Sequence, residues 1–213
     1  MTAPLKEDYD ALELQYRNEE SLMSKKLRLV DSHVKGGHSL LDIGSGTGEF
    51  IKLEKGKFDR ILGIDVEDEA VRRLAKRFEN ERTIQILRGN IADLSKLFGK
   101  NAFEYVTCLD VLEHLGPKDV RTALREVHEV LKPKGVFILT APGVFEKIRI
   151  AVGMSPTHRH SRSSYGWARI CREAGLRIRS VESIEFPLVK SEFLRKNLHL
   201  LGKCCVIVAE KKQ

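Results

Sequence analysis

Apolar residues along this chain change repeatedly between the spacing of strands and the spacing of helices. Short, nearly continuous apolar runs occupy residues 39–43, 60–65, 84–87, 103–109 and 136–140. Between them, 67–79 and 117–131 place apolar side chains every three or four residues, as on one face of a helix. Pro117 starts the second of these helices. The alternation predicts a parallel sheet covered by helices on both faces.

Both ends of the chain depart from this alternation. Residues 9–34 have near-helical apolar spacing and predict one or two helices, which end at Gly36 and Gly37. After Pro142 comes an irregular segment rich in Gly, Ser, His and Arg, followed by a predicted helix over 164–174. Two further apolar stretches, 176–186 and 204–210, predict an antiparallel hairpin at the sheet edge.

Composition places the chain among ordinary folded domains. Its 213 residues suit one domain, and 42% hydrophobic with 31% charged residues is far from the composition of disordered chains. No apolar run reaches the ~18–20 residues of a membrane helix, and the first residues lack a signal-peptide pattern. We therefore expect a cytoplasmic protein. Its four cysteines form no C-x-x-C pair, which favours buried thiols over disulfides or a zinc site.

The basic charge is concentrated in one part of the sequence. The chain carries a formal net charge of +7, of which 147–203 contributes +8 and the remainder −1. Such a segment either faces an anionic partner or substrate, or forms a solvated basic face. The sequence leaves both interpretations open.

The strongest local motif is a glycine-rich turn after the first strand. Gly44, Gly46 and Gly48 permit a tight strand-to-helix turn whose backbone N–H groups face a ligand. Glu49 stands where the third glycine of a dinucleotide fingerprint would be, which disfavours pyrophosphate binding. Asp65 ends the second strand, 21 positions after Gly44, and is suited to accept hydrogen bonds from ribose hydroxyls; capping the following helix is the alternative.

Five segments in order, LLDIGSGTG, ILGIDV, LRGNIADL, FEYVTCLDVLEHL and LKPKGVFILTAPG, resemble class I S-adenosylmethionine-dependent methyltransferases of the methyltransferase type 11 kind. The resemblance spans about residues 40–142. It implies an α/β fold with a Rossmann-like, doubly wound, seven-stranded mixed sheet and helices on both faces. The single domain (1–213) would then comprise an N-terminal helical segment (1–37), a cofactor-binding core (38–141), and a substrate cover with C-terminal strands (142–213).

The resemblance also implies S-adenosyl-L-methionine as cofactor and assigns residues to it. Asp42, Gly44 and Gly46 would surround its methionine part, Asp65 would bind the ribose, and Val66 would pack on the adenine. The remaining cofactor-binding residues would be Ser45, Gly48, Asn90, Ile91 and Leu109. Related proteins usually carry an acid where Asn90 stands, so here the amide oxygen must accept from the exocyclic amine, unless Asp93 substitutes.

Candidate acceptor-side residues follow the fourth and fifth strands. His114, in the segment after the fourth strand, could accept a proton or orient the acceptor, with Glu113 orienting its ring; a role in holding the loop is the alternative. Arg159, His160, Arg162 and Tyr165 would lie on a cover over the acceptor. Two histidines around Arg159 lack a nearby carboxylate or cysteine, so no metal site is predicted.

Together these features predict methyl transfer to an O or N nucleophile of a small, anionic metabolite or lipid-linked acceptor by a monomer or homodimer. Nucleic acid is an alternative acceptor, which the basic segment favours and the absence of an N-P-P-[YF] motif disfavours. Residues 148–178 have a fainter similarity to MetW-type proteins. That similarity allows a different class of function, a non-catalytic cofactor-binding partner module.

Overall fold

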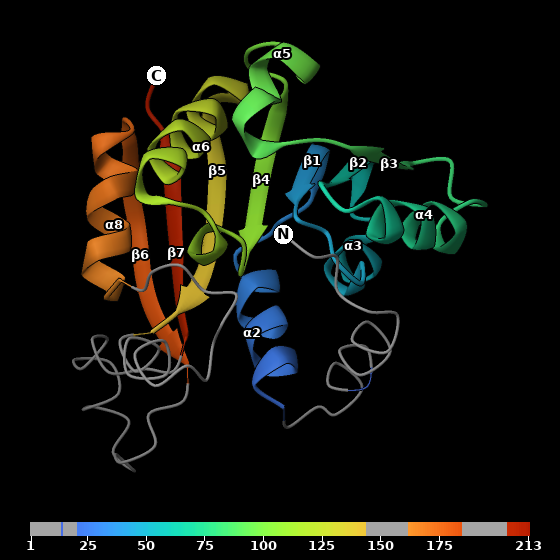
Figure 1. Cartoon of the computed structure of the whole chain (residues 1–213), viewed down its shortest axis with the longest axis horizontal. Helices are drawn as coiled ribbons and strands as arrows, with labels where there is room; N and C mark the ends of the chain where they lie inside the picture. Colours follow the sequence, from blue (N-terminus) through green and yellow to red (C-terminus); the bar gives the residue numbers. More distant parts are fainter. Residues whose placement is uncertain (1–13, 15–20, 144–161, 185–203) are drawn as a thin grey trace.

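The computed structural model describes residues 14, 21–143, 162–184 and 204–213, which form one twisted sheet with helices on both faces (Figure 1). The strand order is β3-β2-β1-β4-β5-β7-β6. β1 to β5 are mutually parallel, whereas β7 is antiparallel to both its neighbours. The predicted seven-stranded mixed sheet is thereby confirmed. The strands are β1 (Gly37–Ile43), β2 (Phe58–Asp65), β3 (Ile84–Arg88), β4 (Phe103–Leu109), β5 (Leu131–Pro142), β6 (Leu176–Ile184) and β7 (Cys204–Lys211).

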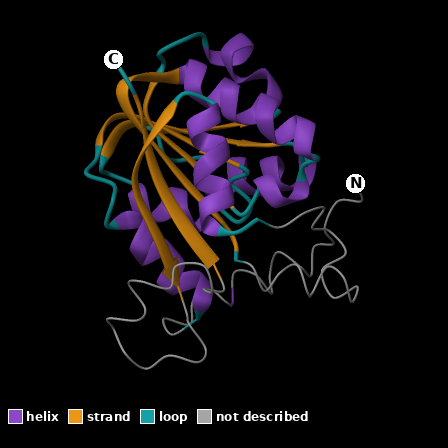
Figure 2. Cartoon of the chain, turned by 90° about the vertical axis from the view of Figure 1, so that its left-hand side faces the viewer, coloured by secondary structure: helices purple, strands orange, loops and turns teal. Residues whose placement is uncertain are grey.

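The helices divide between two hydrophobic cores, one on each face of the sheet (Figure 2). One core is formed with α2 (Leu22–Asp31), α3 (Glu49–Glu54) and α4 (Asp68–Arg77). The other is formed with α5 (Leu94–Phe98), α6 (Pro117–Val130) and α8 (Ser164–Glu173). Two short 3₁₀ helices, η1 (Ile91–Asp93) and η2 (Leu112–His114), follow β3 and β4 at the carboxyl edge of the sheet. The doubly wound arrangement follows from amphipathic helices that each bury one apolar face.

The two C-terminal strands form the predicted antiparallel pair at one edge of the sheet, but their order in the sheet is not their order in the sequence. β6 and β7 are antiparallel neighbours, and β7 lies between β5 and β6, so β6 alone forms the edge. The sequence explains this order, because β7 is apolar and buried on both faces whereas β6 exposes Arg177 and Arg179. Cys204 and Cys205 on β7 are free, buried thiols, as are Cys108 and Cys171. Burial raises the pKa of Cys171, Cys204 and Cys205 to about 12.

Element boundaries agree with the sequence pattern where the pattern is strong. Of the predicted helical segment 9–34, the described part contains α2; the residues before it lie outside the described ranges. β5 begins at Leu131, directly after α6, earlier than the predicted Val136. Lys134, with φ +65°, lies within this early part of the strand. Within the described ranges, no helix is long and apolar enough to span a membrane.

The strand order reverses direction beside β1, which lies between β2 and β4. In open parallel sheets the connections leave on opposite faces at such a point, and a crevice forms outside the carboxyl ends of the strands. The glycine-rich turn after β1 and the residues that end β2 and β4 therefore meet at this crevice. α2 lies across the same edge, beyond the end of β4 (Figure 1).

Candidate cofactor-binding site

The turn from β1 to α3 depends on three glycines with positive φ. Gly44, Gly46 and Gly48 have φ values of +68°, +50° and +77°, a region that other residues rarely adopt. The N–H groups of Gly44 and Ser45 both donate to the carbonyl of Ile64 on β2, at 2.8 and 3.1 Å. These hydrogen bonds fix the turn against the end of the neighbouring strand.

The three glycines serve different purposes in the structure. A Cβ atom on Gly44 would lie 2.3 Å from Cγ2 of Val111, and one on Gly48 would lie 2.5 Å from Leu74 on α4. These two positions are therefore required for packing. A Cβ on Gly46 would meet only the Gly44 carbonyl oxygen, at 3.9 Å, so this side of the turn is open. A ligand can approach the backbone here, and cofactor contact by Gly44 and Gly48 remains a prediction.

Asp65 at the end of β2 reaches back to the glycine turn. Its Oδ2 accepts a hydrogen bond from the N–H of Gly46, and its Oδ1 accepts one from the N–H of Glu67, both at 3.1 Å. Glu67 is the N-cap residue of α4. The predicted alternative, that Asp65 caps α4, is therefore wrong, because the N-cap is Glu67 and α4 has no side-chain capping hydrogen bond. Oδ1 of Asp65 fixes the main chain just before the helix, and Oδ2 joins Asp65 to the open side of the turn. Each carboxylate oxygen retains a further lone pair for ribose hydroxyls.

Asp42 lies beneath the turn with only 3% of its surface exposed. Thr107 on β4 donates its hydroxyl to Oδ1 of Asp42 at 2.7 Å, and the Ser45 hydroxyl donates to the Asp42 carbonyl at 3.0 Å. Burial raises the pKa of the Asp42 carboxyl to about 7, with a smaller contribution from the nearby charge of Asp65. Asp42 is therefore close to half-protonated at neutral pH.

The predicted adenine side combines an exposed apolar residue with a capping asparagine. Val66, directly after β2, is 46% exposed and so presents an apolar surface beside Asp65. Asn90 is exposed, and its Oδ1 accepts a hydrogen bond from the N–H of Ala92 at 2.9 Å, capping η1. Ile91 is buried, Asp93 is exposed, and Leu109 is partly buried at the end of β4. The Asn90 oxygen already has one donor, which leaves one lone pair for an exocyclic amine.

The segment after β4 contains contacts that the sequence analysis did not predict. The hydroxyl of Thr140 on β5 donates to Asp110 Oδ1 at 2.9 Å, and Lys26 on α2 donates its ammonium group to Asp110 Oδ2. Lys26 and Asp110 are 84 positions apart, so no local pattern could have revealed the pair. Glu113 is buried, whereas His114 is partly buried and donates its backbone N–H to the Val111 carbonyl at 3.1 Å.

The acceptor-side prediction is only partly covered by the described residues. Arg159 and His160 lie outside the described ranges. Arg162 places its guanidinium carbon 5.7 Å from the ring centroid of the buried Trp167, and Tyr165 is 54% exposed. Tyr165 lies in the first turn of α8, and Arg162 directly precedes the N-cap Ser163. Figure 1 shows that α8 begins toward the carboxyl ends of β4 and β5.

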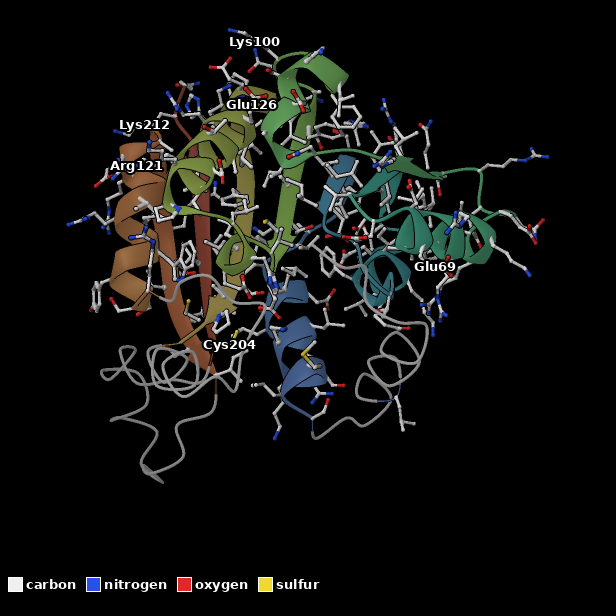
Figure 3. All side chains as sticks on the ribbon, in the orientation of Figure 1. Glu69, Lys100, Arg121, Glu126, Cys204 and Lys212 are labelled. Carbon is white, nitrogen blue, oxygen red and sulfur yellow. The ribbon has the colours of Figure 1, made fainter. Side chains whose placement is uncertain are left out.

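Three arginines of the basic segment form ion pairs away from the glycine turn, and one of them shares its partner with Arg121 on α6. Arg177 and Arg179 both pair with Glu210 on β7, which the sheet register places opposite Val136 of β5. Arg121 and Arg169 both pair with Glu173 on α8. Figure 3 shows Arg121 far from Cys204, which begins β7 at the carboxyl edge. For these arginines the structure supports the interpretation of a solvated, ion-paired face.

Glu49, which breaks the dinucleotide spacing, has a structural partner on α4. Arg77 donates one guanidinium nitrogen to Oε1 of Glu49 at 2.6 Å and the other to the carbonyl of Thr47 at 2.5 Å. Arg77 therefore joins the end of the glycine turn to α4. Opposite charges were the only sequence signal for this contact.

The sequence around the glycine turn and the two acids is similar to that of known proteins. Residues 41–139 match the methyltransferase domain family. An uncharacterized methyltransferase of Bacillus subtilis, YcgJ, is 31% identical over 114 residues, covering 53% of this chain and 44% of that protein. The erythromycin 3''-O-methyltransferase of Saccharopolyspora erythraea is 34% identical over 111 residues, covering 50% and 35% of the two chains. The present chain thus spans about half the length, or less, of these curated relatives.

A solved structure shares the whole architecture. The S-adenosylmethionine-dependent methyltransferase of Archaeoglobus fulgidus superposes with a TM-score of 0.71 at 21% identity, covering 95% of this chain and 99% of that one. At this identity the likeness concerns the fold, and the family match covers residues 41–139. Residues 41–139 therefore match a methyltransferase domain, and the sheet that carries them has the fold of the S-adenosylmethionine-dependent methyltransferase with which it superposes.

Proposed function

We propose that this protein transfers a methyl group from S-adenosylmethionine to an O or N nucleophile on a small, anionic metabolite or lipid-linked group. The observation that carries the proposal is the open side of the turn at Gly46, with the Asp65 carboxylate hydrogen-bonded to the same N–H group. The exposed Val66 lies directly after this acid. An adenosine ligand needs this combination of a glycine approach, a carboxylate for ribose hydroxyls and an apolar surface for the base.

The residues around the turn fit the chemical groups of the cofactor. Asp65 has acceptor capacity for two ribose hydroxyls. Asp42 is buried beneath the turn and hydrogen-bonded to Thr107, so its influence on a cationic ligand is electrostatic and not by direct contact. The chemistry that bound S-adenosylmethionine supplies is an electrophilic methyl group on a sulfonium sulfur. Transfer of that methyl group depends on alignment of the nucleophile, so a dedicated base is needed only where the acceptor must lose a proton.

His114 is the residue we propose for that role. It is partly buried, lies in η2 directly after the carboxyl end of β4, and has its main chain fixed by the hydrogen bond to Val111. An imidazole in this position can accept a proton near neutral pH or hold the acceptor. The erythromycin relative is an O-methyltransferase by name, which supports a hydroxyl as one class of acceptor.

Titration calorimetry with S-adenosylhomocysteine and NAD tests the cofactor assignment. We expect S-adenosylhomocysteine to bind far more tightly, and Asp65→Ala to weaken binding by about 1.5–3 kcal/mol, the magnitude of hydrogen bonds to a charged group. Tighter binding of NAD would reject the proposal. Catalysis is then tested by S-adenosylhomocysteine formation from S-adenosylmethionine with pooled metabolites and lipids. A MetW-type binding module would bind the cofactor yet form no product with any acceptor.

Substitution of Arg162 and Arg159 tests whether the acceptor is anionic. Once an acceptor is found, Arg162→Gln combined with Arg159→Gln should raise its KM with little change in cofactor affinity. For duplex DNA, the logarithm of the binding constant falls with the logarithm of salt concentration, with a slope of about −0.9 per phosphate contact. A steep salt dependence together with methylation of tRNA or DNA would favour a nucleic-acid acceptor. An unchanged KM would remove the argument for an anionic one.

A further inference from the structure

Helix α2 is held against the carboxyl edge of the sheet by ion pairs in its middle and at its C-terminal end. Lys26, in its N-terminal half, pairs with Asp110 after β4, and Asp31, its last residue, pairs with Lys57. Just beyond the helix, Nε2 of His33 lies 2.8 Å from Oε1 of Glu182 on β6. These contacts hold α2 at the carboxyl edge of the sheet. Figure 1 shows the helix there, beyond the end of β4.

Lys26 differs from the charged residues of the other two pairs because it is almost fully buried. It is 3% exposed, and its ammonium nitrogen lies 3.3 Å from the sulfur of Met23 in addition to its contact with Asp110. Burial lowers the pKa of Lys26, while the nearby Cys204 and Glu113 act in the opposite direction. A buried ammonium group is strongly unfavourable without a counter-ion, so the carboxylate of Asp110 is needed where it stands.

Asp110 holds a backbone conformation that needs support. Its φ is +56°, a left-handed conformation that is unfavourable for residues other than glycine, although Asp and Asn tolerate it best. Three contacts support it. Its N–H donates to the Thr140 carbonyl at 3.1 Å, its Oδ1 accepts from the Thr140 hydroxyl, and its Oδ2 accepts from Lys26. Two of these contacts come from β5, and only the third comes from α2.

The next residue transmits the position of Asp110 to the cofactor turn. Val111 packs so closely against Gly44 that a Cβ atom there would lie 2.3 Å from its Cγ2. The carbonyl of Val111 also accepts the backbone N–H of His114. A continuous series of contacts therefore runs from Lys26 through Asp110 and Val111, and reaches both the glycine turn and His114.

We propose that Lys26 is a positioning residue, which through its ion pair with Asp110 sets the orientation of residues 110–114 against the glycine turn. Helix α2 then acts on the site through Asp110 and Val111. The expected effect of Lys26 on cofactor binding and catalysis rests on the proposed function. The coupling of α2 to residues 110–114 rests only on the contacts described above.

Three single variants and one double variant separate positioning from stability. Lys26→Met removes the ammonium group and keeps an unbranched apolar stem. Asp110→Asn removes the charge, tolerates the positive φ and keeps an acceptor for Thr140. The matched control is Asp31→Asn, which breaks the ion pair at the other end of the same helix. Each is assayed for thermal stability, for the Kd of S-adenosylhomocysteine by calorimetry, and for amide hydrogen exchange of residues 110–114.

We expect Lys26→Met to raise the Kd about tenfold, a common size for coupling through residues that do not touch the ligand, and to accelerate exchange in 110–114. Asp31→Asn should lower stability while leaving the Kd and this exchange unchanged. The Lys26→Met/Asp110→Asn double variant is the decisive one. With no unpaired charge left, its stability should recover toward that of the wild type, yet its Kd and exchange should remain perturbed.

Recovery of the Kd together with stability in the double variant would overturn the inference, because the pair would then act through folding alone. Wild-type exchange and Kd in Lys26→Met would overturn it as well. If the wild-type protein bound no S-adenosylhomocysteine, the proposed function would fail. The exchange measurement at residues 110–114 would still decide whether Lys26 positions them.

Discussion

The buried carboxyl of Asp42 should make the free energy of unfolding depend on pH. The single substitution Asp42→Asn allows this contribution to be measured. Its pKa is about 7 in the folded protein, against an ordinary value of 3.8, because burial disfavours the charged form. The asparagine of Asp42→Asn can still accept the hydrogen bond from Thr107, but it does not titrate. The difference between wild type and variant therefore reports the ionisation of this one group.

The sign follows from proton binding. Between pH 3.8 and 7 the folded state holds a proton on Asp42 that the unfolded state has lost, so the free energy of unfolding falls as pH rises through this window. A shift of about three units corresponds to about 4 kcal/mol when complete. Relative to wild type, Asp42→Asn should therefore gain stability by up to about 4 kcal/mol from pH 4 to 8, and no further above pH 8.

Urea denaturation at a series of pH values measures this difference directly. Glu54 is also buried, with its pKa raised to about 8, and would contribute a slope of the same sign in both proteins. Comparison with Asp42→Asn cancels that contribution, and Glu54→Gln provides the parallel experiment. A stability difference that is independent of pH between 4 and 8 would show that Asp42 is ionised throughout, and the reasoning from burial would be wrong.

Further predictions concern binding, catalysis and the basic face. Gly46→Val should abolish S-adenosylhomocysteine binding and also lower thermal stability, because a φ of +50° is strained for a β-branched residue. Gly48→Ala should lower thermal stability because its Cβ would lie 2.5 Å from Leu74, and measurable binding by folded Gly46→Val would contradict the assignment of the open side to the ligand. His114→Ala should lower turnover by about 10²–10⁴-fold with little change in cofactor affinity if His114 is a base, and His114→Asn should not restore turnover. Loss of stability with normal turnover per folded molecule would indicate a structural role. Removing Arg177 and Arg179 together should destabilise the fold by about 1–3 kcal/mol in chemical denaturation, because the buried Glu210 carboxylate loses its ion pairs. Adding Glu210→Gln should recover most of that loss, and a changed acceptor KM would refute the assignment of these arginines to a structural face.

The sequence by itself determined the features that depend on local order along the chain. Apolar periodicity is set by the repeat of the helix or strand, so it predicted the alternation from β1 to β5 and the apolar face of α6. The meeting of the glycine turn with Asp65 was also predictable. Adjacent parallel strands end at the same edge, and the register pairs Ile43 with Ile64, which brings the following residues together.

Only the tertiary structure decided which side chains from distant segments touch. Gly44 and Gly48 have the same sequence signature as Gly46, yet packing against Val111 and Leu74 distinguishes them. The apolar pattern of 204–210 predicted a strand at the sheet edge but not that it lies between β5 and β6. The Lys26–Asp110 and Arg77–Glu49 pairs likewise have no local signature. Periodicity specifies which face of an element is buried, whereas the partner it meets depends on how every helix and strand packs at once.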